Sequence, residues 1–336
     1  MAESSSEFDL AIFGAGTWGT ALACAWGSSG HKVALWGRGE EKMAQLARTR
    51  MHPRLNGAEL PAKVTPLSDP RRAFTAAHWV SCLPVQATPG AWMELMASAP
   101  KKPKLLVHSS KGLLQASHLT LSQTLEPQLG LPVGALSGPT FADEVARGLP
   151  SAIVLALPET VDEAAALDLQ HFLATDRLRV YRSRDVVGAE LCGALKNVLA
   201  IAAGLVEGLG LGHNARAALI TRGLAEMSRL VDALGGQRET VMGLAGMGDL
   251  MLTAAGPQSR NRRLGAELAK GVGLEAALET LGGQVAEGAS TTKAALALAA
   301  SVGVELPITE AVANLLDGED PHQAVDSLMG RSLKEE

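Results

Sequence analysis

Cysteine is scarce in this chain of 336 residues, and its placement limits what the protein can be. It occurs three times, at Cys24, Cys82 and Cys192, without a CxxC pair and without histidine at zinc-ligand spacing. Cysteines so far apart argue against a disulfide scaffold and against a zinc site, so we expect no metal and a reducing compartment. We expect all three to be small buried apolar side chains rather than catalytic thiols.

Long apolar runs and aromatic residues are also scarce. No segment reaches the ~18 consecutive apolar residues of a membrane helix. The first residues, MAESSSEFDLAIFGAG, lack the basic region and the apolar run of a signal peptide. We therefore expect a cytoplasmic protein that does not insert into membranes. Because aromatics are only 3% of a chain that is 47% apolar, the core must consist mainly of Leu, Ala and Val.

An excess of positive charge is absent as well. The chain has 35 acidic and 30 basic residues, which gives a formal charge of −5. This balance argues against a broad nucleic-acid surface, so we expect a small molecule rather than a nucleic acid as the partner.

The length exceeds what one core usually organises, so two domains are expected. In the first 180 residues, short apolar runs bounded by Gly, Pro and Ser alternate with helical patches, which is typical of a parallel α/β sheet. The expected strands are 8–13, 32–36, 78–83, 104–109, 133–137, 151–157 and 178–182.

The pattern changes near residues 181–187, after which long Ala/Leu-rich segments have helical spacing. One such segment, 218–236, ends at Gly235 and Gly236, which favour a helix stop. We expect an α/β Rossmann-like domain over 1–184 and an all-α domain over 185–336.

A glycine-rich turn follows the first expected strand. FDLAIFGAGTWGTALA contains Gly14-x-Gly16-x-x-Gly19 between a strand and a helix, and a second strand follows. In this context Gly14 permits the tight turn, Gly16 lets the backbone approach a pyrophosphate, and Gly19 allows close helix packing. The pattern predicts a dinucleotide site; the alternative is an ordinary glycine-rich turn.

The end of the second strand bears on which dinucleotide binds. NAD enzymes usually have an acidic residue there for the ribose hydroxyls, whereas this chain has Arg38. Because a guanidinium can pair with a 2′-phosphate, we expect NADPH to be used at least as well as NADH. Alternatively, Arg38 is a solvated loop cation and Glu40 or Glu41 contacts the ribose.

Two further turns follow strands, where open α/β sheets bind their ligands. Lys111 lies in SSKGL directly after one strand, and Gly138-Pro139 opens SGPTFADE after another. Taken alone, Lys111 could equally be a surface residue.

Polar residues also interrupt apolar segments of the second half. Lys196 and Asn197 lie inside GALKNVLAIAAG, and Asp249 follows the glycine-rich GLAGMG. A lysine among apolar neighbours is desolvated, which lowers its pKa towards the range of a general acid or base. The alternatives are a lysine whose stem lies along an apolar face and an aspartate that caps a helix.

QSRNRRLG gathers three arginines, Arg260, Arg262 and Arg263, in an acidic chain. The cluster is either a solvated helix surface or part of an anion site. Nothing in the spacing directs all three arginines into one cradle.

Together these segments resemble the bacterial-type NAD(P)-dependent glycerol-3-phosphate dehydrogenases, in order over about residues 8 to 330. The resemblance is carried by GAGTWGTALA, LWGR, SSKGL, SGPTFADEVARGLPSAI, the long block VGAELCGALKNVLAIAAGLVEGLGLGHNARAALITRGLAEMSRL, GLAGMGDLMLT, QSRNRRLG and VELPITEAV. Residues 50–61 match the family pattern poorly, so no site residue is expected from them.

The resemblance implies an enzyme that interconverts dihydroxyacetone phosphate and sn-glycerol 3-phosphate for phospholipid synthesis, and a homodimer. It implies that Lys196 is the proton donor and acceptor. It implies that the substrate is contacted by Lys111, Gly138, Thr140, Lys196, Asp249, Ser259, Arg260 and Asn261. It implies that the cofactor, NADPH or NADH, is contacted by Thr17, Trp18, Arg38, Lys111, Ala142, Arg260, Val285 and Glu287.

The chemistry of ketone reduction agrees with this assignment. The nicotinamide supplies a hydride, and Lys196 can supply the proton, with Asp249 and Asn197 orienting its ammonium beside the substrate. Lys111 can stabilise the oxyanion or the phosphate.

The substrate phosphate gives the arginine cluster a function. Arg260 can bind it, with Ser259 and Asn261 adding hydrogen bonds. We expect Arg262 and Arg263 to face solvent or acidic neighbours.

Two alternatives remain open at this stage. A β-hydroxyacid or 6-phosphogluconate dehydrogenase also combines a Rossmann domain, a helical domain and a catalytic lysine, but lacks the QSRN block. A non-catalytic NADP sensor would need no proton-transfer lysine, and Lys196 is present.

Overall fold

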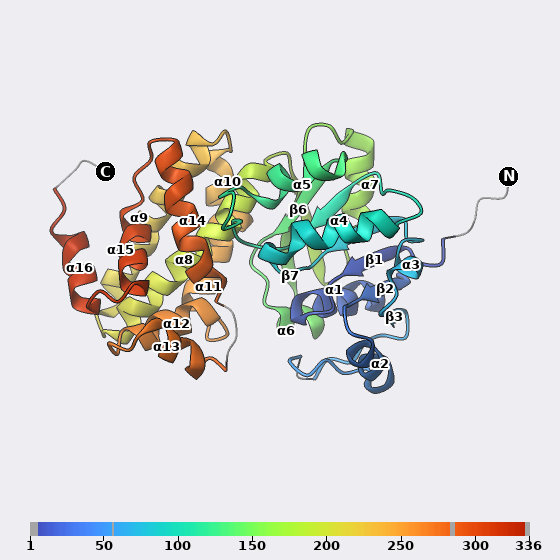
Figure 1. The fold of residues 1–336 in the computed structure, drawn as a ribbon, viewed down its shortest axis with the longest axis horizontal. Helices are drawn as coiled ribbons and strands as arrows, with labels where there is room; N and C mark the ends of the chain where they lie inside the picture. Colours follow the sequence, from blue (N-terminus) through green and yellow to red (C-terminus); the bar gives the residue numbers. More distant parts are fainter. Residues whose placement is uncertain (1–5, 56, 283–285, 333–336) are drawn as a thin grey trace. The chain divides into compact units, whose positions relative to one another are not determined.

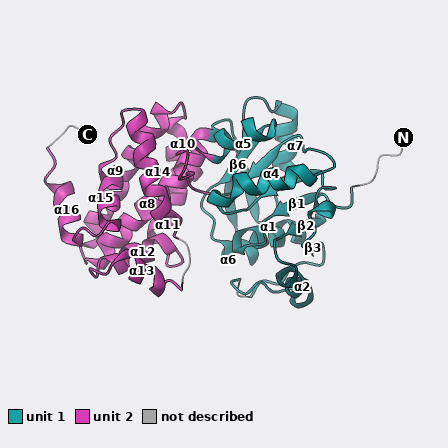
Figure 2. Ribbon diagram, in the orientation of Figure 1, with its two compact units in different colours: residues 1–110, 121–186 teal, residues 111–120, 187–336 magenta. Residues whose placement is uncertain are grey.

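The computed structural model describes residues 6–55, 57–282 and 286–332. It divides the chain into two compact units (Figure 2). The sheet unit comprises residues 1–110 and 121–186, and the helical unit comprises residues 111–120 and 187–336. The main boundary lies close to the one expected from the sequence, whereas residues 111–120 belong to the second unit rather than the first.

The sheet unit is built on eight strands in the order β3-β2-β1-β4-β5-β6-β7-β8 (Figure 1). Their bounds are β1 Leu10–Phe13, β2 Val33–Trp36, β3 Val64–Leu67, β4 His78–Ser81, β5 Leu106–His108, β6 Val133–Ser137, β7 Ser151–Ala156 and β8 Leu178–Ser183. Neighbouring strands are parallel except β6 and β7, which pair antiparallel. All seven expected strands are present, and the sheet is mainly parallel as expected, with β6 and β7 as its one antiparallel pair among the described strands.

Strand β3 was not expected from the sequence. It reads VTPL, and its Pro66 weakens the strand signal because proline cannot donate to a sheet ladder. The strand lies at the edge of the sheet, where this loss is tolerated.

Both faces of the sheet carry buried side chains because β1 alternates between them. Leu10 and Ile12 lie in one cluster with Trp26, which belongs to a helix. Phe13 points to the other face and packs edge-on against Trp92, with ring centroids 4.9 Å apart. The sheet is therefore covered on both sides, as parallel sheets generally are. The helices of this unit are α1 Thr17–Ser28, α2 Glu40–Thr49, α3 Pro70–Ala73, η1 Val85–Ala87, α4 Thr88–Ser98, α5 Leu121–Leu129, α6 Ala142–Ala146 and α7 Glu163–Leu173.

The helical unit forms around α8, Val186–Gly208, most of whose residues are buried. This helix is apolar and long enough to cross a membrane, but 94% of its most apolar window is buried inside the protein. As expected from the sequence, it holds no uninterrupted apolar run of ~18 residues, because Glu190, Lys196 and Asn197 lie within it. Its burial is typical of a core helix. The remaining helices are α9 Gly212–Ala233, α10 Arg238–Met242, the π-helix η2 Leu244–Gly248, α11 Asp249–Ala255, α12 Arg260–Leu268, α13 Leu274–Thr280, α14 Glu287–Ser301, α15 Pro307–Leu316 and α16 Pro321–Met329.

Helices α8 and α12 touch through their backbones. A Cβ added to Gly204 of α8 would lie 1.9 Å from the Arg262 carbonyl oxygen. A Cβ added to Gly265 of α12 would lie 1.9 Å from the Ile201 carbonyl oxygen. Because real Cβ atoms do not approach backbone so closely, only glycine at both positions allows this crossing.

Residues 111–120 join the helical unit through Leu113. Its side chain is fully buried in the same apolar core as Leu195 and Val198 of α8. The neighbouring Lys111 is therefore delivered to the helical unit, although it follows β5 of the sheet in the chain.

Candidate active site

The glycine turn between β1 and α1 lies where the strand order reverses, because β1 neighbours both β2 and β4. Gly14 has φ +124°, and a Cβ there would lie 2.5 Å from the carbonyl oxygen of Cys82, which follows β4. A Cβ on Gly19 would lie 2.0 Å from the Gly14 carbonyl oxygen. Both positions therefore require glycine for close packing.

Gly16 differs from the other two glycines of this turn. A Cβ there would meet nothing within 4 Å, so the backbone at Gly16 faces open space. Gly16 is also the N-cap of the twelve-residue helix α1, and no side chain caps that end. A helix N-terminus with exposed N–H groups and positive potential can bind a pyrophosphate, so this turn fits a dinucleotide.

Arg38 lies beside this turn. A Cβ on the preceding Gly37 would lie 2.8 Å from the Ala15 Cβ, so the loop after β2 packs against the glycine turn. The Arg38 side chain is exposed. Glu40 and Glu41 form the first turn of α2, where carboxylates favour the helix N-terminus, so they have a structural function there.

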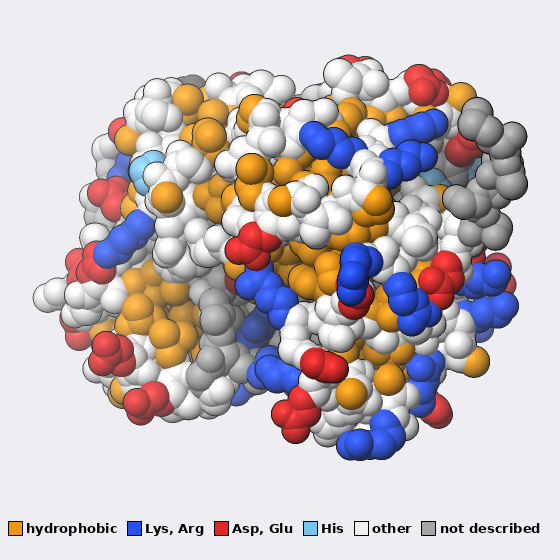
Figure 3. Space-filling view, turned by 45° about the vertical axis from the view of Figure 1, so that its right-hand side comes forward, with side chains coloured by type: hydrophobic (Ala, Val, Ile, Leu, Met, Phe, Trp, Pro, Cys, Tyr) orange, Lys and Arg blue, Asp and Glu red, His pale blue; other side chains and the backbone are white. Residues whose placement is uncertain are grey.

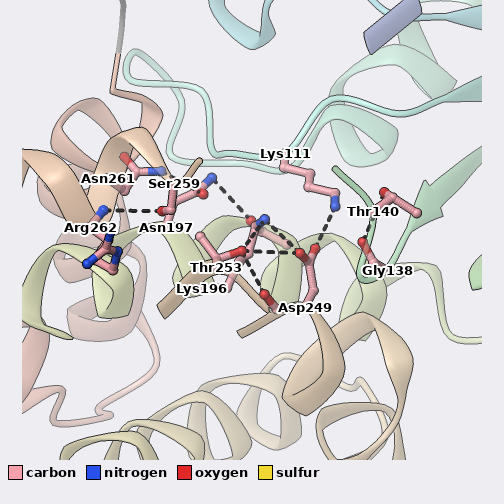
Figure 4. A network of polar contacts seen from close by, with 11 residues as sticks. Lys111, Gly138, Thr140, Lys196, Asn197, Asp249, Thr253, Ser259, Asn261 and Arg262 are labelled. Atoms are coloured by element: carbon pink, nitrogen blue, oxygen red, sulfur yellow. Dashed lines mark hydrogen bonds and ion pairs between the residues drawn. The ribbon is translucent and has the colours of Figure 1, made fainter. Parts of the chain in front are cut away.

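The other expected cofactor residues of the sheet unit lie around α1 and α6. Trp18 and Ala142 pack on one small apolar cluster that also contains Leu55, and Thr17 is the first residue of α1. Val285 lies outside the described residues. The substrate expectation for Gly138 and Thr140 falls on the loop after β6; Gly138 has φ +145°, and Thr140 Oγ1 donates to its carbonyl oxygen at 3.3 Å (Figure 4).

In the helical unit, two lysines share one buried carboxylate (Figure 4). Lys196 Nζ lies 2.7 Å from Asp249 Oδ1, and Lys111 Nζ lies 2.5 Å from Asp249 Oδ2. Asp249 is 1% exposed and Lys196 is 8% exposed. The three residues come from α8, from the first residue of α11 and from the 111–120 segment, and the fold brings them into one cluster.

Thr253 completes this cluster and was not identified from the sequence. Its Oγ1 accepts a hydrogen bond from Lys196 Nζ at 2.9 Å and donates to the Asp249 carbonyl oxygen at 2.7 Å. Thr253 follows Asp249 by four residues, which is one helical turn on α11. That spacing was the available signal, and it becomes informative only once Asp249 is known to be buried.

The surroundings set the protonation of the cluster. Burial lowers the pKa of Lys196 from 10.5 to about 8, although the Asp249 carboxylate opposes this shift; the Lys111 ammonium adds to it. Burial alone would raise the pKa of Asp249, but the two lysines outweigh it and hold that pKa below its ordinary value. Asp249 is therefore ionised, and Lys196 can exchange a proton near neutral pH.

A second polar chain connects α8, α12 and α14. Asn261 Nδ2 donates to Asn197 Oδ1 at 2.8 Å, and Asn261 Oδ1 accepts from the Gly288 N–H at 3.0 Å. Asn197 and Asn261 are 4% and 8% exposed. Ser259 is the N-cap of α12 and accepts from the Arg262 N–H at 3.2 Å. The expected roles of Asn197 in orienting Lys196 and of Ser259 and Asn261 in contacting substrate stay predictions, and these contacts show how each side chain is held.

Arg260 and Glu287 lie at the start of α12 and α14. The Arg260 side chain is exposed, and α12 begins at this residue. Burial raises the pKa of Glu287, while Arg260, Lys196 and Lys111 pull it back. The influence of these three cations on one carboxyl group indicates a concentration of positive charge at this part of the helical unit, which suits an anionic ligand.

The other two arginines of the cluster differ from one another. Arg263 is exposed, as expected. Arg262 has the acidic neighbour that the sequence led us to expect, Glu207, and its side chain is only 14% exposed. The close contact of α12 with α8 covers it.

Among the described residues, no group of three or more His, Cys, Asp or Glu side chains is placed to hold a metal ion. No disulfide joins the three cysteines, all of which lie in the described part of the chain; Cys24 and Cys192 are buried as expected, whereas Cys82 is partly buried. Burial raises the pKa of Cys24 to about 11 and that of Cys82 to about 12, which makes both thiols unreactive.

Comparison with known proteins finds a family match for each of the two units. Residues 9–162 match the family model described as NAD-dependent glycerol-3-phosphate dehydrogenase N-terminus, and residues 185–326 match the C-terminus model of the same family. The chain belongs to the NAD-dependent glycerol-3-phosphate dehydrogenase family. The two matched ranges correspond closely to the sheet unit and the helical unit.

Individual members of this glycerol-3-phosphate dehydrogenase family are similar to this chain over nearly the whole length of both proteins. A glycerol-3-phosphate dehydrogenase [NAD(P)+] from Thioalkalivibrio sulfidiphilus is 45% identical, and the match covers 98% of this chain and 99% of the relative. A glycerol-3-phosphate dehydrogenase [NAD(P)+] from Dechloromonas aromatica is 47% identical, and the match covers 97% of this chain and 99% of the relative. The crystal structure of a glycerol-3-phosphate dehydrogenase from Coxiella burnetii has a TM-score of 0.90 at 38% identity, covering 96% and 99%.

Proposed function

We propose that this chain reduces dihydroxyacetone phosphate to sn-glycerol 3-phosphate with NAD(P)H and catalyses the reverse oxidation. The observation that carries the proposal is the buried Lys196, whose ammonium is held by Asp249 and Thr253 at 2.7 and 2.9 Å. The relatives are named glycerol-3-phosphate dehydrogenase [NAD(P)+], and this supplies the substrate and cofactor class.

Proton transfer is assigned to Lys196. When bound, the nicotinamide supplies the hydride that reduces the carbonyl carbon. The Lys196 ammonium donates a proton to the carbonyl oxygen as negative charge develops on it, and the neutral amine accepts a proton in the reverse direction. Asp249 and Thr253 fix Nζ so that its third hydrogen is available to the substrate. Lys111 lies across the same carboxylate and can stabilise the oxyanion or the phosphate.

Phosphate binding is assigned to the start of α12. Arg260 contributes a guanidinium, and Ser259 and Asn261 contribute hydrogen bonds. A charged donor combined with further hydrogen bonds suits a phosphate group. Gly138 and Thr140 are proposed substrate contacts on the loop after β6.

Dinucleotide binding is assigned to the glycine turn, which fits the group because Gly16 leaves its backbone uncovered at the N-terminus of α1. Thr17, Trp18, Arg38 and Ala142 of the sheet unit, and Lys111, Arg260, Val285 and Glu287, are the proposed further cofactor contacts. NAD and NADP are the cofactors of the relatives, and a preference for NADPH is proposed from Arg38.

We expect the initial rate of NADPH oxidation to be substantial with dihydroxyacetone phosphate and low with β-ketoacid substrates of β-hydroxyacid dehydrogenases. NADP reduction with 6-phosphogluconate should likewise be low. A preference for either alternative substrate class would replace the proposed function with that alternative. The absence of any turnover, together with tight NADPH binding, would favour a sensor.

The pH dependence of both directions should report Lys196. Because the folded pKa is about 8, the ammonium is present below that pH and is lost as the pH rises through it. The kcat/KM for dihydroxyacetone phosphate should therefore fall above pH about 8, and kcat/KM for glycerol 3-phosphate oxidation should rise through the same range. An inflection more than about one pH unit away would contradict this assignment.

Replacing Arg38 with aspartate should shift preference from NADPH towards NADH, because a phosphate partner becomes a partner for ribose hydroxyls. The measured quantity is the ratio of kcat/KM for the two cofactors. Arg48, in the last turn of α2, offers a matched control through Arg48→Asp. An unchanged ratio in Arg38→Asp would show that Arg38 does not select the cofactor.

A homodimer in the cytoplasm, serving phospholipid synthesis, completes the proposal. Light scattering during size-exclusion chromatography tests the dimer directly. On the face that Figure 3 shows, Lys and Arg side chains form separate groups with Asp and Glu side chains among them, which supports a small-molecule partner over a nucleic acid.

A further inference from the structure

We infer that Arg262 is a positioning residue for the phosphate site: it fixes the first turn of α12 and thereby holds Arg260 and Asn261 in place for the substrate phosphate. The inference rests on the proposed reduction of dihydroxyacetone phosphate. It assigns different tasks to adjacent arginines, since Arg260 binds the anion and Arg262 holds the helix that presents Arg260.

The Arg262 guanidinium connects α12 to two other helices. Its Nε donates to the Gly256 carbonyl oxygen at 3.1 Å, and Gly256 is the C-cap of α11, the helix that begins with Asp249. Its Nη1 donates to both carboxylate oxygens of Glu207, which lies near the end of α8. One side chain therefore ties the start of α12 to both helices that carry the Lys196–Asp249 pair.

The burial of this side chain makes the connection effective. The Arg262 side chain is 14% exposed, whereas that of Glu207 is 43% exposed. Ion pairs on open surfaces contribute little, but a largely covered guanidinium is costly to leave without partners. A planar guanidinium can donate in two fixed directions at once, which the single ammonium of lysine cannot reproduce.

The backbone around Arg262 leaves α12 little freedom. Its N–H donates to Ser259 Oγ at the N-cap, and its carbonyl oxygen lies where a Cβ of Gly204 would be. Gly265, one turn further along α12, lies equally close to the backbone of α8. The position of α12 is therefore set by direct contact with α8 on one side and by the Arg262 side chain at its start.

Loss of the Arg262 side chain should weaken the contacts to the phosphate end of the substrate and leave those to the carbonyl end in place. Arg260 and Asn261 belong to the first turn of α12 and move with it. Lys196, Asp249 and Lys111 lie on other elements and are held by their own contacts at 2.5–2.7 Å. The contribution of the substrate phosphate to kcat/KM should fall, while proton transfer to the carbonyl oxygen is retained.

The test compares dihydroxyacetone phosphate with unphosphorylated dihydroxyacetone in the full-length enzyme. The ratio of the two kcat/KM values measures how much the phosphate contributes to catalysis. In Arg262→Ala this ratio should fall roughly 10- to 100-fold, because small displacements of a binding group have effects of this size. The rate with dihydroxyacetone should stay within about threefold of the unsubstituted enzyme.

Three variants act as comparisons. Arg262→Lys should restore only part of the ratio, and Glu207→Gln should lower it less than Arg262→Ala does. Arg263→Ala removes the adjacent exposed arginine and should leave the ratio within about threefold. Thermal unfolding is measured for every variant, and all rates are taken below the lowest transition. Glu207→Gln keeps the inference testable if Arg262→Ala does not fold.

A second readout separates this inference from the proposed reaction. Calorimetric titration with sn-glycerol 3-phosphate should show weaker binding for Arg262→Ala than for Arg263→Ala. If the unsubstituted enzyme binds this ligand but reduces no dihydroxyacetone phosphate, the proposed function fails and the titration still decides the role of Arg262. Parallel loss of activity on both substrates with an unchanged ratio, or equal binding by the two alanine variants, would overturn the inference.

Discussion

Replacing Lys196 with methionine should lower kcat roughly 10²- to 10⁴-fold, the range that general acid–base catalysis typically supplies. The physical reason is that Lys196 Nζ is the buried group held by both Asp249 and Thr253, and its pKa of about 8 suits proton exchange. Methionine fills a similar volume but has no proton that it can donate to the substrate. Steady-state kcat is the measurement, and NADPH affinity from fluorescence should stay within a few-fold.

Lys293 provides a matched control for this change. It lies on α14 and pairs with Asp317 at the surface, with a side chain that is 68% exposed. Lys293→Met should leave kcat nearly unchanged because exposed ion pairs contribute little. A Lys196→Met enzyme that kept more than about a tenth of kcat would be incompatible with proton transfer by Lys196.

Replacing Arg260 with alanine should lower kcat/KM for dihydroxyacetone phosphate roughly 30- to 5,000-fold. The phosphate is the only strongly charged group of the substrate, and a closed site removes much of its water. A desolvated dianion needs a charged partner that also donates hydrogen bonds, and Arg260 is the exposed guanidinium at the start of α12. Because phosphate binding also positions the carbonyl, kcat should fall as KM rises.

Arg260→Lys should recover part of this loss, since a point charge lacks the two-pronged contact. Added guanidinium ion should partly restore Arg260→Ala and should not restore Lys196→Met, where the missing group is a proton donor. Arg263→Ala should change kcat/KM less than about tenfold. A damaging Arg263→Ala together with a mild Arg260→Ala would show that the phosphate site has been assigned to the wrong arginine.

Features that depend on neighbouring residues could be predicted from the sequence. The glycine turn after β1 was identifiable because each of its glycines meets a requirement of the turn itself. Gly14 and Gly19 indeed lie too close to backbone for any side chain. Lys196 was identifiable as desolvated because Leu195, Val198 and Leu199 lie close to it in the chain, and the structure buries it to 8% exposure. Seven strands and the change to helices near residue 185 followed from period and composition for the same reason.

Features that depend on contacts between distant segments could not be predicted. Lys111 and Asp249 are 138 residues apart in the chain, and they lie 2.5 Å apart only in the folded protein, where Leu113 near Lys111 is buried in the helical core. The antiparallel pairing of β6 with β7 is likewise a matter of how strands meet, which their residue types do not specify.

Adjacent arginines show the same division most directly. Nothing in QSRNRRLG distinguishes Arg262 from Arg263, because both are cations on one helical turn. The tertiary structure separates them: the glycine contacts bring α12 against α8, so one arginine is covered and paired with Glu207 while the other stays exposed. The sequence by itself determined which residue types are present, and only the packing of helices decided which of these two arginines is covered and paired and which stays exposed, since burial and partners are properties of contacts between segments far apart in the chain.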